Sequence, residues 1–172
     1  PAPISPYGVT KLDGEYYCGM FAREGWLPTV CLRYFNVFGP RQDPKSPYAA
    51  AVAIFADRAA HGQDVTIHGD GAQTRDFVFV KDVVAANAYL AQRPESGVFN
   101  VACGQGTSIR ALADQIIALT GSSSQVVHGP PRAGDIKHSL ARVDKLLATD
   151  FRPKWTVAAG LRAMLPPRAK PA

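Results

Sequence analysis

Apolar positions recur along the chain in two rhythms, one typical of helices and one typical of short buried strands. Apolar side chains three and four positions apart predict helices at 6–24, 48–61, 82–92, 109–119, 143–148 and 157–164. Short β-branched and aromatic runs between them predict strands at 29–35, 65–67, 77–80, 98–102 and 125–128. Because strands alternate with helices, we expect an α/β fold.

Polar and turn-forming residues separate these elements. Ser5 stands where it can cap the first helix, and Gly25 stands where that helix should end. The segments 36–42, 68–76 and 129–135 are rich in Gly, Pro, Asp and Asn, and we expect them to be loops.

Length and composition are typical of one globular unit. The chain has 172 residues, of which 47% are hydrophobic and 19% charged, which is enough for a sizeable core. No apolar run approaches the ~20 residues of a membrane-spanning helix, and the first residues show no signal-peptide pattern. The net charge of +5 is dispersed along the chain. We therefore expect neither a membrane nor a nucleic-acid partner.

The three cysteines are Cys18, Cys31 and Cys103. Their odd number and their spacing fit neither a disulfide framework nor a zinc site, so we expect reduced thiols and a cytoplasmic protein. No histidine has a metal-binding partner at a useful spacing, and we expect no metal.

Tyr7 and Lys11 stand four residues apart in the first predicted helix, so their side chains share one face. A free tyrosine titrates near ~10 and is a poor base at neutral pH. A neighbouring ammonium favours the phenolate, which can then take a proton from a sugar or alcohol hydroxyl. The same spacing is common in ordinary helices, so the pair gains weight only from other motifs.

Three further motifs follow this pair. In order, the four are Tyr7-x-x-x-Lys11, Arg33-Tyr34-Phe35-Asn36-Val37-Phe38-Gly39-Pro40-Arg41, Gly69-Asp70-Gly71-x-Gln73-x-Arg75-Asp76-Phe77 and Arg132-x-Gly134-Asp135. With these motifs the chain resembles the C-terminal half of an extended short-chain dehydrogenase/reductase of the NAD-dependent epimerase/dehydratase group. It looks like a UDP-galactose or UDP-N-acetylglucosamine 4-epimerase, and the resemblance covers about residues 4–165.

The resemblance implies catalytic and cofactor-binding roles. Tyr7 would be the acid/base, and Lys11 would lower its pKa and hold the nicotinamide ribose of NAD. Tyr34 and Phe35 would lie near the nicotinamide. In the family, a hydride passes from the sugar C4 to NAD and returns to the other face of the 4-keto sugar.

The resemblance also implies a site for a UDP-sugar, formed by Asn36, Thr66, His68, Arg75, Arg132 and Asp135. Asn36 would contact the diphosphate, and Arg75 and Arg132 would pair with the phosphates through their planar guanidinium groups. Asp135 would accept hydrogen bonds from the ribose hydroxyls. His68 would line the uracil pocket, at a position where the family usually has an aromatic ring.

Simpler structural interpretations stand beside these roles. Asn36 can be a turn residue, and Arg75 can form a surface ion pair with Asp76, which would contribute little. Arg132 and Asp135 can be a solvated pair in a loop rich in Pro and Gly.

The glycine-rich fingerprint of a dinucleotide site is missing from this sequence. Gly104-x-Gly106 follows a predicted strand and opens a helix, but it lacks the third glycine and the ribose carboxylate, so we assign it no phosphate-binding role. We expect the N-terminal NAD-binding half to be absent, and with it the main cofactor site. The chain is then a C-terminal fragment that is inactive alone.

The resemblance divides the chain into three parts. Residues 1–45 would hold the Tyr/Lys helix and the last strand of a Rossmann-type sheet, 46–165 would be the small α/β region that binds the nucleotide sugar, and 166–172 would be a frayed tail. The strand at 29–35 would extend the Rossmann sheet, and the strands at 77–80 and 98–102 would help form the smaller domain.

The function that these motifs favour is a nucleotide-sugar 4-epimerase of the UDP-hexose type, working as a homodimer. One alternative is a sugar-nucleotide dehydratase or a UDP-glucuronate decarboxylase, although the run 33–36 is more typical of epimerases. Another is a non-catalytic remnant that binds a nucleotide sugar or dimerises, because an isolated half exposes strand edges.

Overall fold

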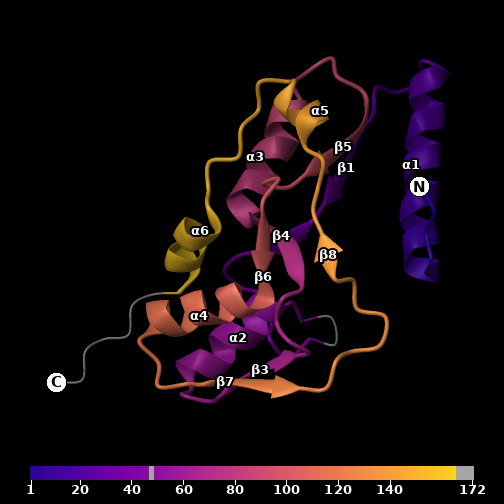
Figure 1. Cartoon of the computed structure of the whole chain (residues 1–172). Helices are drawn as coiled ribbons and strands as arrows, with labels where there is room; N and C mark the ends of the chain where they lie inside the picture. Colours follow the sequence, from indigo (N-terminus) through magenta and orange to yellow (C-terminus); the bar gives the residue numbers. More distant parts are fainter. Residues whose placement is uncertain (47–48, 166–172) are drawn as a thin grey trace.

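The computed structural model describes residues 1–46 and 49–165 (Figure 1). The helices are α1 (Pro6–Arg23), α2 (Ala51–Ala60), α3 (Val80–Leu90), α4 (Ile109–Thr120), α5 (Asp144–Leu147) and α6 (Val157–Met164). The strands are β1 (Val30–Tyr34), β2 (Asn36–Phe38), β3 (Val65–His68), β4 (Thr74–Phe79), β5 (Gly97–Val101), β6 (Gly106–Ser108), β7 (Val126–Gly129) and β8 (His138–Ser139).

Each helix and strand expected from the sequence is present, with shifts at the ends. The helix expected at 48–61 is observed from Ala51, and residue 48 lies outside the described residues. The bounds predicted for the strand at 77–80 are wrong at both ends. The observed strand β4 begins at Thr74, and Val80 already belongs to α3. The tail at 166–172 also lies outside the described residues.

Three short strands were not expected. They are β2, β6 and β8, and β6 lies just before α4. The loop predicted at 36–42 is therefore wrong in its first part. The loop predicted at 68–76 is wrong at both ends, because His68 ends β3 and Thr74 begins β4. Strands of two or three residues have too few positions to show an alternating pattern, and here they form because neighbouring strands offer backbone partners.

The first sheet pairs β1 with β5 in parallel, from Val30 opposite Gly97 to Tyr34 opposite Val101. The strand predicted at 98–102 therefore lies in the same sheet as β1. The pairing is buried on the α3 side, where Phe99 and Val101 are 2% and 1% exposed.

The second sheet starts one residue beyond β1. Phe35 ends the pairing with β5 by donating its N–H to the Val101 carbonyl, at 3.2 Å. From Asn36 the chain pairs in parallel with β4, whose other partners are β6 and β8. A third sheet pairs β3 with β7. Residues 34–36 thus carry the chain directly from one sheet into another.

Two apolar clusters form the core. One joins α2, α4 and α6 to β2, β3 and β4, and the other joins α3 and α5 to β4 and β5. In the first cluster α6 approaches the sheet at Gly160, where an added Cβ would lie 2.6 Å from Phe38 and 2.8 Å from Phe79. Only glycine allows this helix to pack so closely.

The buried carboxylates tie loops to this core. Asp76, on β4, is 0% exposed and accepts backbone N–H bonds from Cys103 and Gly104 at 2.9 Å and from Ala141 at 3.3 Å. Asp82, on α3, is 2% exposed, and its carboxylate accepts hydrogen bonds from two backbone N–H groups in the segment just before α6. Burial raises the pKa of Asp76, and the N–H donors oppose that rise.

Helix α1 is different, because no residue in it is buried. Figure 1 shows it as a separate rod at the side of the molecule. Large apolar side chains on and after it are exposed, among them Tyr16, Tyr17, Phe21 and Trp26. Within the described residues, none of the helices has the length and apolar character needed to cross a bilayer.

Replacing Asp76 with Asn tests the role of its carboxylate. The change puts an amide N–H₂ group among several backbone N–H donors, and each donor left without a partner costs about 1–3 kcal/mol. We expect a large loss in the free energy of unfolding, measured by urea denaturation followed by circular dichroism. Asp70→Asn is the matched control, because exposed Asp70 accepts one N–H bond, from Ala72, that an asparagine can also accept. Equal stability of the two variants would contradict the role.

Candidate active site

The face of α1 that carries Tyr7 and Lys11 is set by a capped first turn. Ser5 is the N-cap, as the sequence predicts, and its Oγ accepts the Gly8 N–H at 3.1 Å. Lys11 Nζ lies 5.2 Å from the centroid of the Tyr7 ring, within the range of a cation–π contact. Tyr7 is 72% exposed, so its hydroxyl is open to a ligand.

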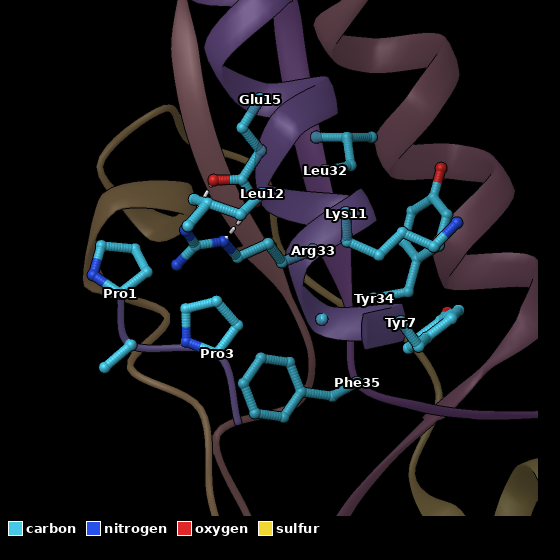
Figure 2. Close-up of a pocket in the computed structure, with 12 residues that line it drawn as sticks. Pro1, Pro3, Tyr7, Lys11, Leu12, Glu15, Leu32, Arg33, Tyr34 and Phe35 are labelled. Atoms are coloured by element: carbon cyan, nitrogen blue, oxygen red, sulfur yellow. Dashed lines mark hydrogen bonds and ion pairs between the residues drawn. The ribbon is translucent and has the colours of Figure 1, made fainter. Parts of the chain in front are cut away.

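A cavity of about 710 Å³ lies between this face of α1 and the end of β1. All four residues predicted to act at the nicotinamide line it: Tyr7, Lys11, Tyr34 and Phe35. Figure 2 shows Tyr7, Lys11 and Tyr34 grouped at one side of this cavity, with the Phe35 ring below them. The Tyr34 hydroxyl donates to Asn87 Oδ1 on α3 at 2.9 Å, which fixes the ring.

An ion pair holds α1 against β1. Arg33 donates from Nε and Nη2 to the two carboxylate oxygens of Glu15, both at 2.6 Å (Figure 2). The Glu15 side chain is 15% exposed and the Arg33 side chain 41%. The hydrogen bond from Arg33 lowers the pKa of Glu15. Since this pair spans the helix and the strand, it sets where Tyr7 stands relative to Tyr34.

A second cavity, of about 640 Å³, lies among α2, β3, β4 and the loop before β8. Its lining includes all six residues predicted to bind the nucleotide sugar: Asn36, Thr66, His68, Arg75, Arg132 and Asp135. These residues come from four separate stretches of the sequence. Their roles toward a ligand remain predictions.

Arg75 reaches across this cavity to the loop before β8. Its Nη2 donates to Asp135 Oδ1 at 2.5 Å, and its Nη1 donates to the Thr74 carbonyl at 2.8 Å. The alternative pairing of Arg75 with Asp76 is wrong, because Asp76 points into the core and is bound by backbone N–H groups. The solvated pair considered for Arg132 and Asp135 is also not what is seen, since Asp135 binds Arg75.

Sequence reasoning missed several residues of this lining. Arg58, on α2, adds a third arginine and is held by its Nε donating to the Asp64 carbonyl at 2.6 Å. Gln73 lies within one of the four motifs, but it received no role; its Nε2 donates to the His68 carbonyl at 2.9 Å. The motif could have drawn attention to Gln73. Arg58 is part of an ordinary helical pattern and gave no signal.

The charge of the second cavity suits an anion. Its lining contains three arginines and one aspartate. Guanidinium groups bind phosphate through two parallel N–H bonds, and an aspartate accepts hydrogen bonds from hydroxyls. Phe35 lines the first cavity and its neighbour Asn36 the second. Adjacent residues of the chain thus border the two cavities.

The donor set of the first cavity fits one end of a dinucleotide. A phenol hydroxyl and an ammonium suit ribose hydroxyls, and the Tyr34 ring suits a flat heterocycle. The Gly104 turn does not offer a phosphate cradle, because the Gly104 N–H is already bound by Asp76. Across the described ranges, no three His, Cys, Asp or Glu side chains gather to hold a metal ion.

Comparison with known proteins gives one consistent result. The sequence profile of the "NAD dependent epimerase/dehydratase family" matches residues 1–102. A putative UDP-glucose 4-epimerase of Methanocaldococcus jannaschii is 34% identical over 163 residues, which is 95% of this chain and 53% of that protein. The chain thus spans about half the length of the curated relatives it matches.

Solved structures agree. The UDP-glucose 4-epimerase of Thermotoga maritima, solved with UDP-glucose, is 41% identical with a TM-score of 0.90 and covers 96% of this chain. The UDP-glucose 4-epimerase of Thermus thermophilus, solved with NAD, is 38% identical with a TM-score of 0.85 and also covers 96%. In both cases the match spans about half of the neighbour, 53% and 54%.

Relatives with other activities match as well. A UDP-N-acetyl-alpha-D-glucosaminuronate decarboxylase of Bacillus cytotoxicus is 38% identical over 125 residues, covering 72% of this chain and 38% of that protein.

Replacing Glu15 with Gln tests the ion pair that holds α1. Because the pKa of Glu15 is lowered in the folded chain, its stabilisation is present above its ordinary value of 4.5 and is lost as pH falls through the folded-state pKa. At pH 7 we expect a loss of about 0.5–1 kcal/mol, or ~2–4 °C in Tm by differential scanning calorimetry. The difference from the unmodified chain should narrow below pH 4.5.

Glu24→Gln is the control on the same helix, because Glu24 is exposed beyond the last turn. It should leave Tm unchanged or slightly raised, since it removes a negative charge from a helix C-terminus. A gap between Glu15→Gln and the unmodified chain that stays constant from pH 7 to pH 3.5 would show that the charge of Glu15 does not act as described.

Proposed function

The chain belongs to the NAD dependent epimerase/dehydratase family, and from this premise we propose that it carries the acid/base pair and the substrate pocket of a UDP-hexose 4-epimerase. The observation that carries the proposal is the junction at Phe35 and Asn36, adjacent residues that line the two cavities. A nucleotide sugar can then lie with its diphosphate at the arginines and its sugar ring toward Tyr7.

Different residues of the chain would act in the two cavities. Arg75 and Arg132 would hold the phosphates, and Asn36 would donate to a phosphate oxygen. Asp135, which binds Arg75 in the free chain, would accept from ribose hydroxyls. Thr66 and His68 would line the base pocket. These contacts use binding energy far from the reacting carbon to orient the sugar.

In the first cavity, Tyr7 Oη would remove the proton of the sugar C4 hydroxyl and return it at the end of the reaction. The Lys11 ammonium, whose Nζ lies 5.2 Å from the centroid of the Tyr7 ring, would stabilise the negative charge that develops on Tyr7 Oη during the transfer. Tyr7, Lys11, Tyr34 and Phe35 would hold the nicotinamide end of NAD, and NAD when bound supplies a reversible hydride acceptor. The main binding site for NAD would lie outside these residues.

Two alternative functions also have support. The decarboxylase relative and the family name keep a dehydratase or decarboxylase as an alternative. A non-catalytic nucleotide-sugar-binding module is the other, because the glycine-rich fingerprint does not occur in this sequence. Titration with NAD tests the enzyme in one direction. NAD binding by this chain would favour an enzyme, whereas UDP binding without NAD binding would fit both the module and an enzyme whose main NAD site lies outside these residues.

We also propose that the chain forms a homodimer in the cytoplasm. Exposed apolar side chains on α1, among them Tyr16, Tyr17 and Phe21, support a partner surface there. The three free thiols support a reducing compartment. Sedimentation equilibrium should give twice the monomer mass, and a monomer at concentrations of tens of micromolar would contradict the dimer.

Titration calorimetry with UDP tests the substrate pocket. We expect the unmodified chain to bind UDP and Arg75→Ala to bind it at least ~10-fold more weakly, because a hydrogen bond to a charged group contributes about 1.5–3 kcal/mol. Arg110→Ala is the matched control. Arg110 pairs with Asp114 on α4 and does not line the cavity, so its loss should leave the affinity unchanged.

Two results would contradict the proposed pocket. The first is the absence of UDP binding by a chain whose circular dichroism shows it to be folded. The second is an equal loss of affinity in Arg75→Ala and Arg110→Ala, which would indicate a general charge effect in place of a defined contact.

A further inference from the structure

Two cysteines face each other across the contact between α1 and β1. Cys18 lies on the helix and Cys31 on the strand, both are partly buried, and both thiols are free. Burial and a hydrogen bond between the two thiols raise the pKa of Cys31 to about 11. The Cys18 thiol is thus a neighbour that acts on the Cys31 thiol.

Contacts on both sides fix this arrangement. Thr29 Oγ1 donates to the Cys18 carbonyl at 2.8 Å, and Arg33 binds Glu15 at 2.6 Å. Thr29, Cys31 and Arg33 alternate along the strand, so they share the face toward α1. Glu15 and Cys18 are three residues apart and share one face of the helix. Cys31 is thus held between two other contacts to the same helix face.

The third cysteine provides a comparison within the same chain. Cys103 lies in the turn before β6, and its Sγ is 3.9 Å from the Trp155 carbonyl. Burial, with the nearby Asp76 and Asp82 carboxylates, raises the pKa of its thiol to about 11. Among the described residues it has no second thiol beside it, because the other two cysteines lie at the α1–β1 contact.

We propose that Cys18 and Cys31 form an oxidation site, at which a peroxide converts the two thiols into a disulfide that fastens α1 to β1. The Cys18 thiol reduces one equivalent of hydrogen peroxide and becomes a sulfenic acid, with release of one water. The Cys31 sulfur then attacks the Cys18 sulfur, the S–O bond breaks, and a second water leaves. Two thiols and one peroxide thus give one disulfide and two waters.

The order of these steps follows from the surroundings of the thiols. Cys31 holds its proton more tightly than a free thiol does, so it is a poor first nucleophile for peroxide. Cys18 therefore reacts first. The sulfenic acid then lies beside Cys31 in the folded chain, and this proximity makes closure faster than further oxidation.

The disulfide would act on the part of the molecule that is held least firmly. No residue of α1 is buried, and side-chain contacts such as the Glu15–Arg33 pair connect it to β1. The same helix carries Tyr7 and Lys11, and the same strand ends at Tyr34. A covalent bond between Cys18 and Cys31 would fix the distance between these two sides of the first cavity. In a reducing compartment such a bond is transient, which suits a reversible response to peroxide.

Peroxide treatment of the reduced, folded chain tests the proposal. After oxidation, the remaining thiols are alkylated in denaturant and the tryptic peptides are analysed by mass spectrometry without reduction. We expect peptide 12–23 linked to peptide 24–33, with Cys103 recovered in its alkylated form. Formation of the link should be at least ~10-fold faster in the folded chain than in the urea-unfolded chain, because folding holds the thiols together.

Two variants make the result specific. Cys103→Ser should form the same link at the same rate. Cys31→Ser should form no link within the chain and should leave a Cys18 sulfenic acid that dimedone traps. If Cys18 and Cys31 are both recovered alkylated after peroxide has oxidised free cysteine in the same tube, the proposal is wrong. It is also wrong if the links formed join separate chains or include Cys103.

Discussion

The buried carboxylate of Asp76 is the interaction on which the arrangement of the second cavity depends. On β4, Asp76 points into the core and binds the N–H groups of Cys103, Gly104 and Ala141, while its neighbour Arg75 points into the cavity. Ala141 follows β8, which pairs with β4 directly after the loop that carries Asp135. One carboxylate therefore fixes the strand that presents the arginine and the loop that presents its partner. Burying a carboxylate is unfavourable, and several N–H donors are what make it tolerable here.

The first cavity is held in a different way. Its two walls are α1, which buries no residue, and the end of β1, which belongs to the sheet with β5. The bidentate Glu15–Arg33 pair and the Thr29–Cys18 hydrogen bond connect the two walls. The side of the molecule that contains the second cavity is therefore a packed core with polar groups at its edge. The side that carries Tyr7 and Lys11 is joined to it by a small number of side-chain contacts.

Much of this could be predicted from the sequence, because the informative residues lie in local patterns. Ser5 caps α1 as its position indicates, and the four motifs contain every residue predicted for the two cavities except Thr66 and His68, which belong to the predicted strand at 65–67 and the residue after it. The short strands β2, β6 and β8 could not be predicted, because they form through partners distant in the sequence. The pairing of Arg75 with Asp135 spans 60 residues and has no local signal either. Arg58 was missed because a lining residue on an otherwise ordinary helix looks like a solvent-exposed charge.

We propose that the cavity lined by Arg75, Arg132 and Asp135 binds the nucleotide diphosphate of a sugar nucleotide. The most direct test is to follow the ¹H–¹⁵N NMR spectrum of the labelled chain as UDP-glucose is added. We expect saturable shifts that are largest for the lining residues, among them Asn36, His68 and Asp135, and small for α5 and the Cys103 turn. Shifts that never saturate, or that are largest on surfaces away from this cavity, would contradict it.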